Sequence, residues 1–107
     1  KGWALMTDLE ICKRIAEIEG AKYTFHSISK PTSITAVFEN RTTFGYNPLT
    51  DDALCFKLMV KYKIQLRKVT NGDGWSASFN KLNHSICTLF NTSPNKAICL
   101  AIIEAHK

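Results

Sequence analysis

The chain has 107 residues, a length typical of one domain, and 45% of them are apolar, which is too high a fraction for a disordered polypeptide. No apolar run approaches the roughly 18 residues of a membrane-spanning helix, and residues 1–5 lack the pattern of a signal peptide. The formal net charge of +5 favours anionic partners, although it also promotes solubility. We therefore expect one cytoplasmic domain over residues 1–107, in which residues 1–5 are either native or an upstream extension before Met6.

The first helix is predicted over residues 7–19. Thr7 and Glu10 have the spacing of a capping box, in which each side chain binds the backbone amide of the other residue. Gly20 is suited to the left-handed conformation that ends a helix. The core-facing positions recur at helical spacing and are Ile11, Cys12, Ile15 and Ile18.

The following stretch is less regular. Residues 34–38 are β-branched or aromatic and predict a strand, whereas Tyr23-Thr24-Phe25 is compatible with a strand or a loop. Gly45 and Asn47-Pro48 predict that residues 41–49 interrupt regular structure.

A second helix is predicted to begin after Thr50, which acts as its cap, and to end near Tyr62. Asp51 and Asp52 suit the positive end of its dipole better than a metal site. Its apolar stripe consists of Leu54, Cys55, Leu58, Met59 and Tyr62.

Three strands should follow, over residues 64–69, 75–79 and 85–90. Asn71-Gly72-Asp73-Gly74 predicts the hairpin turn between the first two, because Asn-Gly supports positive φ angles. In the middle strand, Trp75, Ala77 and Phe79 share one face, which is expected to point at the helices.

The last helix is predicted to begin at Pro94, with Ser93 as its cap. It is apolar nearly all round, and such a helix needs a second covering surface. We expect Cys99, Leu100 and Ile103 to meet either the first helix or another copy of the chain, and we assign them to the interface of a homodimer or higher homo-oligomer. The element order predicts an α+β fold in which a small antiparallel sheet of three to four strands packs with about three helices, like an ABA sandwich.

The sequence contains no recognisable catalytic or metal-binding motif. The three histidines, His26, His84 and His106, are scattered, and no phosphate-binding loop or catalytic triad occurs. The four cysteines, Cys12, Cys55, Cys87 and Cys99, form no C-x-x-C pair and are expected to be reduced. We therefore expect no enzyme activity, no metal and no cofactor.

One region is rich in cations, and we call it the basic segment: Lys57, Lys61, Lys63, Arg67 and Lys68. Together with Trp75 it is assigned to binding an anionic partner, because basic residues beside an aromatic ring suit nucleotides and nucleic acids. The alternative is that Trp75 belongs to the core and that the cations are merely solvated.

A family resemblance adds to these patterns. Residues 46–53 lead into a helix that ends at Lys61-Tyr62, a hairpin carries Trp75-Ser76-Ala77, and Ala97-Ile98-Cys99-Leu100-Ala101 lies in the closing helix. With Met6-Thr7-Asp8-Leu9-Glu10, this order resembles small phage and prophage proteins of the NinX-like and phage ABA sandwich type. The resemblance covers residues 6–20 and 46–107 and carries no catalytic residues.

The resemblance implies a phage or prophage accessory protein that acts in the cytoplasm of the bacterial host cell. We expect a counter-defence or host-takeover protein that binds and sequesters a host protein or a small anionic nucleotide that serves as an immune signal. The alternative is a nucleic-acid-binding module of phage gene regulation or replication, and a small enzyme is the third hypothesis. No membrane partner is expected.

Overall fold

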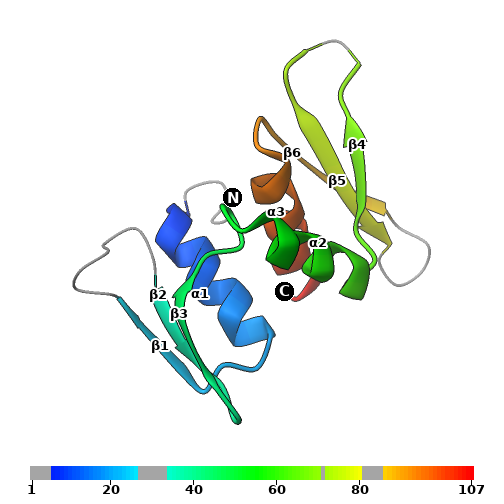
Figure 1. Cartoon of the computed structure of the whole chain (residues 1–107). Helices are drawn as coiled ribbons and strands as arrows, with labels where there is room; N and C mark the ends of the chain where they lie inside the picture. The colour runs from blue at the N-terminus through cyan, green and yellow to red at the C-terminus, as the bar shows by residue number, and fades with distance from the viewer. Residues whose placement is uncertain (1–5, 27–33, 71, 81–85) are drawn as a thin grey trace. The chain divides into compact units, whose positions relative to one another are not determined.

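The computed structural model describes residues 6–26, 34–70, 72–80 and 86–107. Within these residues, three helices and two three-stranded antiparallel sheets form an α+β fold (Figure 1). The chain divides into two compact units, Lys1–Pro48 and Leu49–Lys107. The predicted α+β class is confirmed, but the strands form two sheets rather than one. The expectation of a single domain stays a prediction, since each unit is small for an independent domain.

The first unit begins with helix α1, Asp8–Ile18. The predicted capping box is present, because the Thr7 hydroxyl accepts from the Glu10 amide at 3.2 Å and Glu10 Oε1 accepts from the Thr7 amide at 2.7 Å. Strands β1 (Tyr23–His26), β2 (Ile34–Val37) and β3 (Thr42–Tyr46) follow and pair in the order β1-β2-β3.

Strand β3 corrects the prediction that residues 41–49 interrupt regular structure. The pairing of β2 with β3 is irregular, since Ile34 lies opposite Tyr46 but Ala36 lies opposite Thr43. The extra residue of this bulge is accommodated at Gly45, whose φ of 67° is one that glycine adopts without a steric penalty. The glycine therefore bends a strand here and does not end it.

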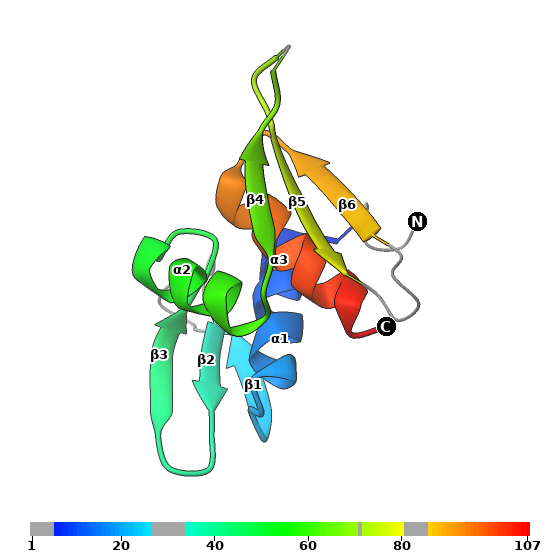
Figure 2. The ribbon, with the colours of Figure 1, turned by 90° about the vertical axis from the view of Figure 1, so that its right-hand side faces the viewer.

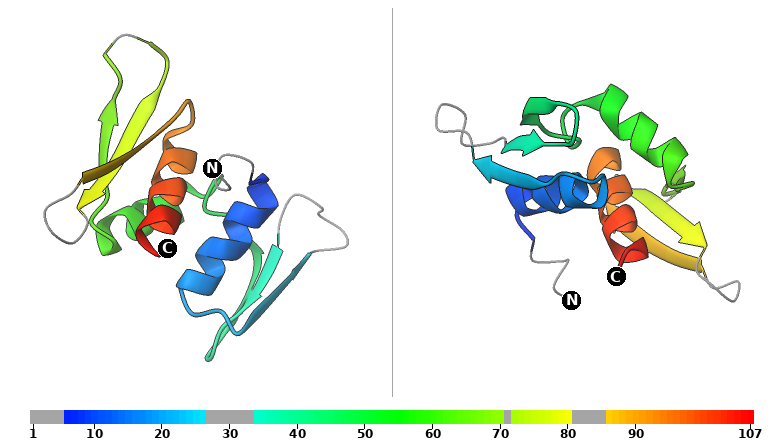
Figure 3. Two further views of the ribbon diagram at one scale, coloured as in Figure 1. Left: turned by 180° about the vertical axis from the view of Figure 1, so that it is seen from behind. Right: turned by 90° about the horizontal axis from the view of Figure 1, so that it is seen from below.

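Helix α1 packs against β1 and β2 and covers one face of this sheet (Figure 3). Ile11 and Ile15 of the helix and Ile34 and Ala36 of β2 are fully buried and form the core of the unit. Because side chains alternate along a strand, Thr35 and its cross-strand partner Phe25 point to the other face of the sheet.

The second unit contains helix α2 (Asp52–Lys61), strands β4 (Gln65–Lys68), β5 (Trp75–Asn80) and β6 (Ile86–Asn91), and helix α3 (Pro94–Ala105). The strand order is β4-β5-β6; α3 packs across β5 and β6, and α2 packs on α3 (Figure 2). Ser93 caps α3 as predicted. The cap of α2 is Asp51 rather than Thr50, since the Asp51 carboxylate accepts from the Leu54 amide at 3.1 Å.

The register of this second sheet separates its two faces. Leu66, Ala77 and Leu89 lie opposite one another on the face that α3 covers. The predicted hairpin between β4 and β5 is confirmed by the pairing of Lys68 with Trp75, although Asn71 itself lies outside the described residues. So does the predicted bend at residues 81–84.

Candidate binding pocket

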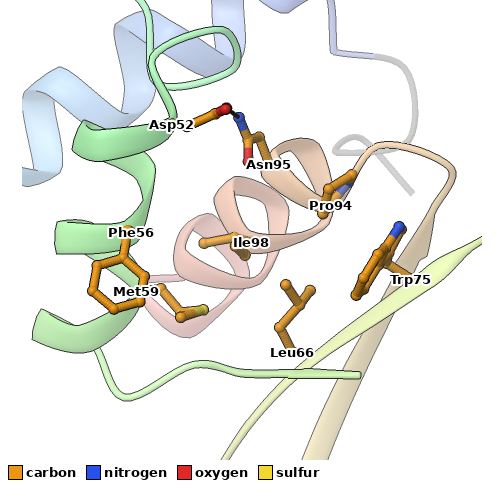
Figure 4. A pocket seen from close by; sticks show the side chains of 8 residues that line it. All are labelled: Asp52, Phe56, Met59, Leu66, Trp75, Pro94, Asn95 and Ile98. Carbon is orange, nitrogen blue, oxygen red and sulfur yellow. Dashed lines mark hydrogen bonds between the residues drawn. The ribbon is translucent and has the colours of Figure 1, made fainter. Parts of the chain in front are cut away.

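A pocket of about 330 Å³ opens among α2, α3, β4 and β5, all within the second unit (Figure 4). We call it the α2–α3 pocket. It is lined by Asp52, Phe56, Met59, Leu66, Trp75, Pro94, Asn95 and Ile98.

Helix and strand periodicity explain why these side chains converge. Phe56 and Met59 are three residues apart on α2 and therefore lie on the same side of that helix. Pro94 and Ile98 are related in the same way on α3, at a spacing of four residues. Trp75 lies on the helix-facing side of β5, two residues before the buried Ala77. The pocket is thus a gap in the packing of three layers and not a loop feature.

The polar groups at the edge of the pocket bind each other. The Asn95 side-chain amide donates to Asp52 Oδ1 at 2.8 Å (Figure 4). It also donates to the Leu49 carbonyl at 3.1 Å. These bonds join the first turn of α3 to the start of α2. They also leave an inner surface that is mainly apolar, which suits an apolar ligand group better than a polar one.

The structure does not gather the basic segment into one patch. Lys68 lies on the same sheet face as Trp75, and its Nζ is 5.5 Å from the centre of the indole ring and 3.4 Å from the Gly72 carbonyl oxygen. Arg67 points to the opposite face because neighbouring strand residues alternate. Of Arg67 and Lys68, only Lys68 therefore lies on the sheet face of Trp75, which lines the pocket.

The other three cations lie elsewhere. On α2, Lys57 and Lys61 are exposed and lie one helical turn apart. Successive residues of an α-helix are rotated by about 100°, so Lys57 points away from the side of the helix on which Phe56 lines the pocket. Lys63 is exposed in the turn after α2, with a φ of 56°. The assignment of these residues and of Trp75 to binding stays a prediction.

The residues assigned to a subunit interface are buried within the chain. Cys99 is 0% exposed, Leu100 3% and Ile103 1%. Their apolar surface is thus not displayed by the single chain, and their role in self-association stays a prediction.

Three of the cysteines, Cys12, Cys55 and Cys99, are free and buried, and the side chain of Cys87 lies outside the described residues. A hydrogen bond with the Cys99 thiol lowers the pKa of Cys55, against burial and the charges of Asp52 and Asp51, which raise it. Cys55 Sγ also lies 3.8 Å from the Asn95 carbonyl oxygen.

In the described part of the chain, no group of three or more His, Cys, Asp or Glu side chains could hold a metal ion. None of the helices described is long and apolar enough to cross a lipid bilayer.

Phe56 is a pocket residue to which the sequence patterns assign no role. A signal was available, because Phe56 falls outside the apolar stripe of α2, on the solvent side. It is 61% exposed, and Val60, one turn later, is 59% exposed. A large apolar residue at a position where polar residues are expected can indicate a binding surface.

Comparison with known proteins supports the family resemblance. A search among curated proteins gives no match. The profile of the family described as Bacteriophage P22, NinX matches residues 3–106, which is nearly the whole chain and includes the residues 21–45 that the sequence motifs left unassigned. The chain therefore belongs to the NinX family of bacteriophage P22.

Proposed function

We propose that this phage-encoded protein is a non-enzymatic binding protein that sequesters an acidic protein of the bacterial host by taking one of its apolar side chains into the α2–α3 pocket. It acts in the host cytoplasm, in counter-defence or host takeover. Membership of a phage family supports the phage origin, and the pocket and the charge support the mode of binding.

The observation that carries the proposal is the apolar pocket with a mutually bonded polar edge. Its volume of about 330 Å³ suits a small group such as one aromatic or branched side chain. Protein interfaces concentrate their binding energy in such buried anchors, which fill pockets on the partner. The exposed rings and methyl groups of Phe56 and Val60 extend the apolar surface outward along α2.

The charge of the same unit indicates the sign of the partner. Residues 49–107 contain eight Lys and Arg against four Asp and Glu, so this unit carries four of the five net positive charges of the chain. Because long-range attraction depends on total charge more than on a shared patch, the dispersed lysines still accelerate association with an acidic surface.

A nucleotide ligand is the second candidate, and Lys68 beside Trp75 favours it. A base can stack on an indole ring while a neighbouring ammonium binds phosphate. The edge of a base would, however, compete for Asp52 and Asn95, which already bind each other. This competition favours the protein ligand.

Selection from a displayed library of random peptides tests the proposal. Peptides that combine acidic residues with an aromatic or large aliphatic residue should be enriched. Phe56→Ala should weaken the binding of a selected peptide by about tenfold or more, the usual effect of truncating an anchor contact. Phe90→Ala is the matched control, since Phe90 is 66% exposed but lies on the face of the sheet opposite the helices.

The charge component is tested on the same peptide with Arg67→Glu/Lys68→Glu, which should weaken binding severalfold at low salt and less at high salt. Enrichment of basic or purely polar peptides, or equal loss in Phe56→Ala and Phe90→Ala, would contradict the proposal. Thermal stabilisation by mononucleotides or cyclic dinucleotides, abolished in Lys68→Glu, would support the nucleotide instead.

A further inference from the structure

The face of the β1–β3 sheet that α1 leaves uncovered carries three exposed aromatic rings. Tyr23 and Phe25 of β1 are 59% and 50% exposed, and Phe44 of β3 is 79% exposed. The register places Phe25 opposite Thr35 of the central strand, and Phe44 occupies the bulge on the other side of that threonine. The three rings therefore belong to one surface.

This surface, which we call the aromatic face, carries no charged side chain among the strand residues that the structure describes. Alternation along the strands assigns six side chains to it: Tyr23, Phe25, Thr35, Val37, Thr42 and Phe44. Exposed apolar surface of this kind marks a site of protein association.

We propose that the aromatic face is the contact through which two copies of the chain associate, face to face about a two-fold axis. An uncharged surface is self-complementary, and its burial between two copies leaves no ion without a partner. Two β-sheets pack in this way at about 10 Å, with the side chains of both faces interdigitating.

The area agrees with a weak dimer. At roughly 200 Å² for each aromatic side chain, the three exposed fractions correspond to about 380 Å² on one copy. Two copies would bury roughly 750 Å² through these rings alone, before Val37 and Thr42 are included. Stable interfaces bury about 1,200–2,000 Å², so the dimer should dissociate on dilution.

A single-stranded nucleic acid is the other occupant that stacked aromatic rings suit, but it requires cations along the strand. Two basic residues that flank the described strands of this sheet, Lys22 and Arg41, are already engaged. Lys22 Nζ lies 3.1 Å from Glu39 Oε1, and the Arg41 guanidinium stacks 4.2 Å from the Phe38 ring centre and donates to Thr43 Oγ1 at 3.2 Å. A second copy therefore fits the surface better than a polyanion.

The test is sedimentation of the full chain from about 1 μM to about 1 mM, a range that covers weak self-association. The wild type should shift from monomer to dimer, and Phe25→Thr/Phe44→Thr should remain monomeric with unchanged circular dichroism. Phe44→Lys is a second variant that alters one highly exposed side chain and introduces repulsion across the axis. Phe90→Thr, on the other sheet, is the matched control and should dimerise like the wild type.

A monomeric wild type over the whole range would overturn the proposal, and so would a dimer that both Phe25→Thr/Phe44→Thr and Phe44→Lys leave intact. A monomeric chain whose binding of a labelled thymidine oligonucleotide is lost in Phe44→Lys and Phe25→Thr/Phe44→Thr alike would reassign the face to nucleic acid. The peptide binding that depends on Phe56 is a separate readout, so the two proposals can fail independently.

Discussion

The hydrogen bond between Asn95 and Asp52 at the edge of the pocket should contribute measurably to the free energy of unfolding. Asn95→Ala removes two bonds, to the Asp52 carboxylate and to the Leu49 carbonyl. At about 1 kcal/mol for each bond, the variant should lose about 2 kcal/mol of the free energy of unfolding. Asp52→Ala removes one bond and one favourable charge at the start of α2, and should lose about 1–1.5 kcal/mol.

The double variant separates the shared bond from the other effects. If the two side chains interact as the geometry indicates, Asn95→Ala/Asp52→Ala should be about 1 kcal/mol more stable than the sum of the single losses predicts. Asp52→Ala combined with Asn80→Ala is the control cycle, because Asn80 is an exposed residue on β5, and it should give no coupling.

Urea unfolding in a Trp3→Phe background measures these energies, since Trp75 is then the sole tryptophan and reports on the second unit. One kcal/mol corresponds to roughly 4–8 °C in melting temperature for a domain of this size, so calorimetry provides an independent check. A coupling energy indistinguishable from zero would show that the bond contributes nothing to stability. It would also contradict the inference that the polar groups at the edge of the pocket are already satisfied.

Three further predictions concern caps, backbone and thiols. Thr7→Ala should destabilise the chain by about 0.5–2 kcal/mol through loss of the capping box, whereas Thr7→Ser should retain most of the stability; equal melting temperatures for the two would contradict this. Gly45→Ala should cost about 1–2 kcal/mol, measured by urea unfolding, because the φ of 67° is unfavourable for alanine although its methyl group would meet no atom within 4 Å. The lowered pKa of Cys55 means that the folded chain binds fewer protons than the unfolded chain just below the ordinary thiol pKa, so stability should rise with pH across that window. Cys99→Ala removes the cause and should flatten the rise just below the ordinary thiol pKa, whereas Cys99→Ser should preserve it; an unchanged slope in Cys99→Ala would refute the assignment.

The sequence by itself determined the elements whose signals are local. The capping box at Thr7, the proline at the start of α3 and the alternation through Trp75 are short-range patterns, and each produced the expected helix or strand. The family resemblance was also contained in such motifs, and the family match confirms it over residues 3–106.

Local signals failed where a long-range contact decides the outcome. In the sequence, Gly45 predicts the end of a strand, but pairing with β2 places it in a bulge within β3. The observed cap of α2, Asp51, lies one residue after the predicted cap, Thr50. Both side chains are suitable caps, and only the path of the backbone selects Asp51. The partition of the strands into two sheets could not be predicted either, since strand pairing depends on tertiary contacts.

The candidate sites show the same division. Composition revealed the positive charge and the density of the basic segment, but the alternation of a strand and the rotation of a helix send Arg67, Lys68 and Lys57 in different directions. Phe56 falls outside the apolar stripe of its helix, so its exposure could have been expected from the sequence. Phe44 is indistinguishable from a core residue in the sequence, and tertiary structure alone decided that it is exposed, because burial depends on what packs against a side chain and not on its chemical type.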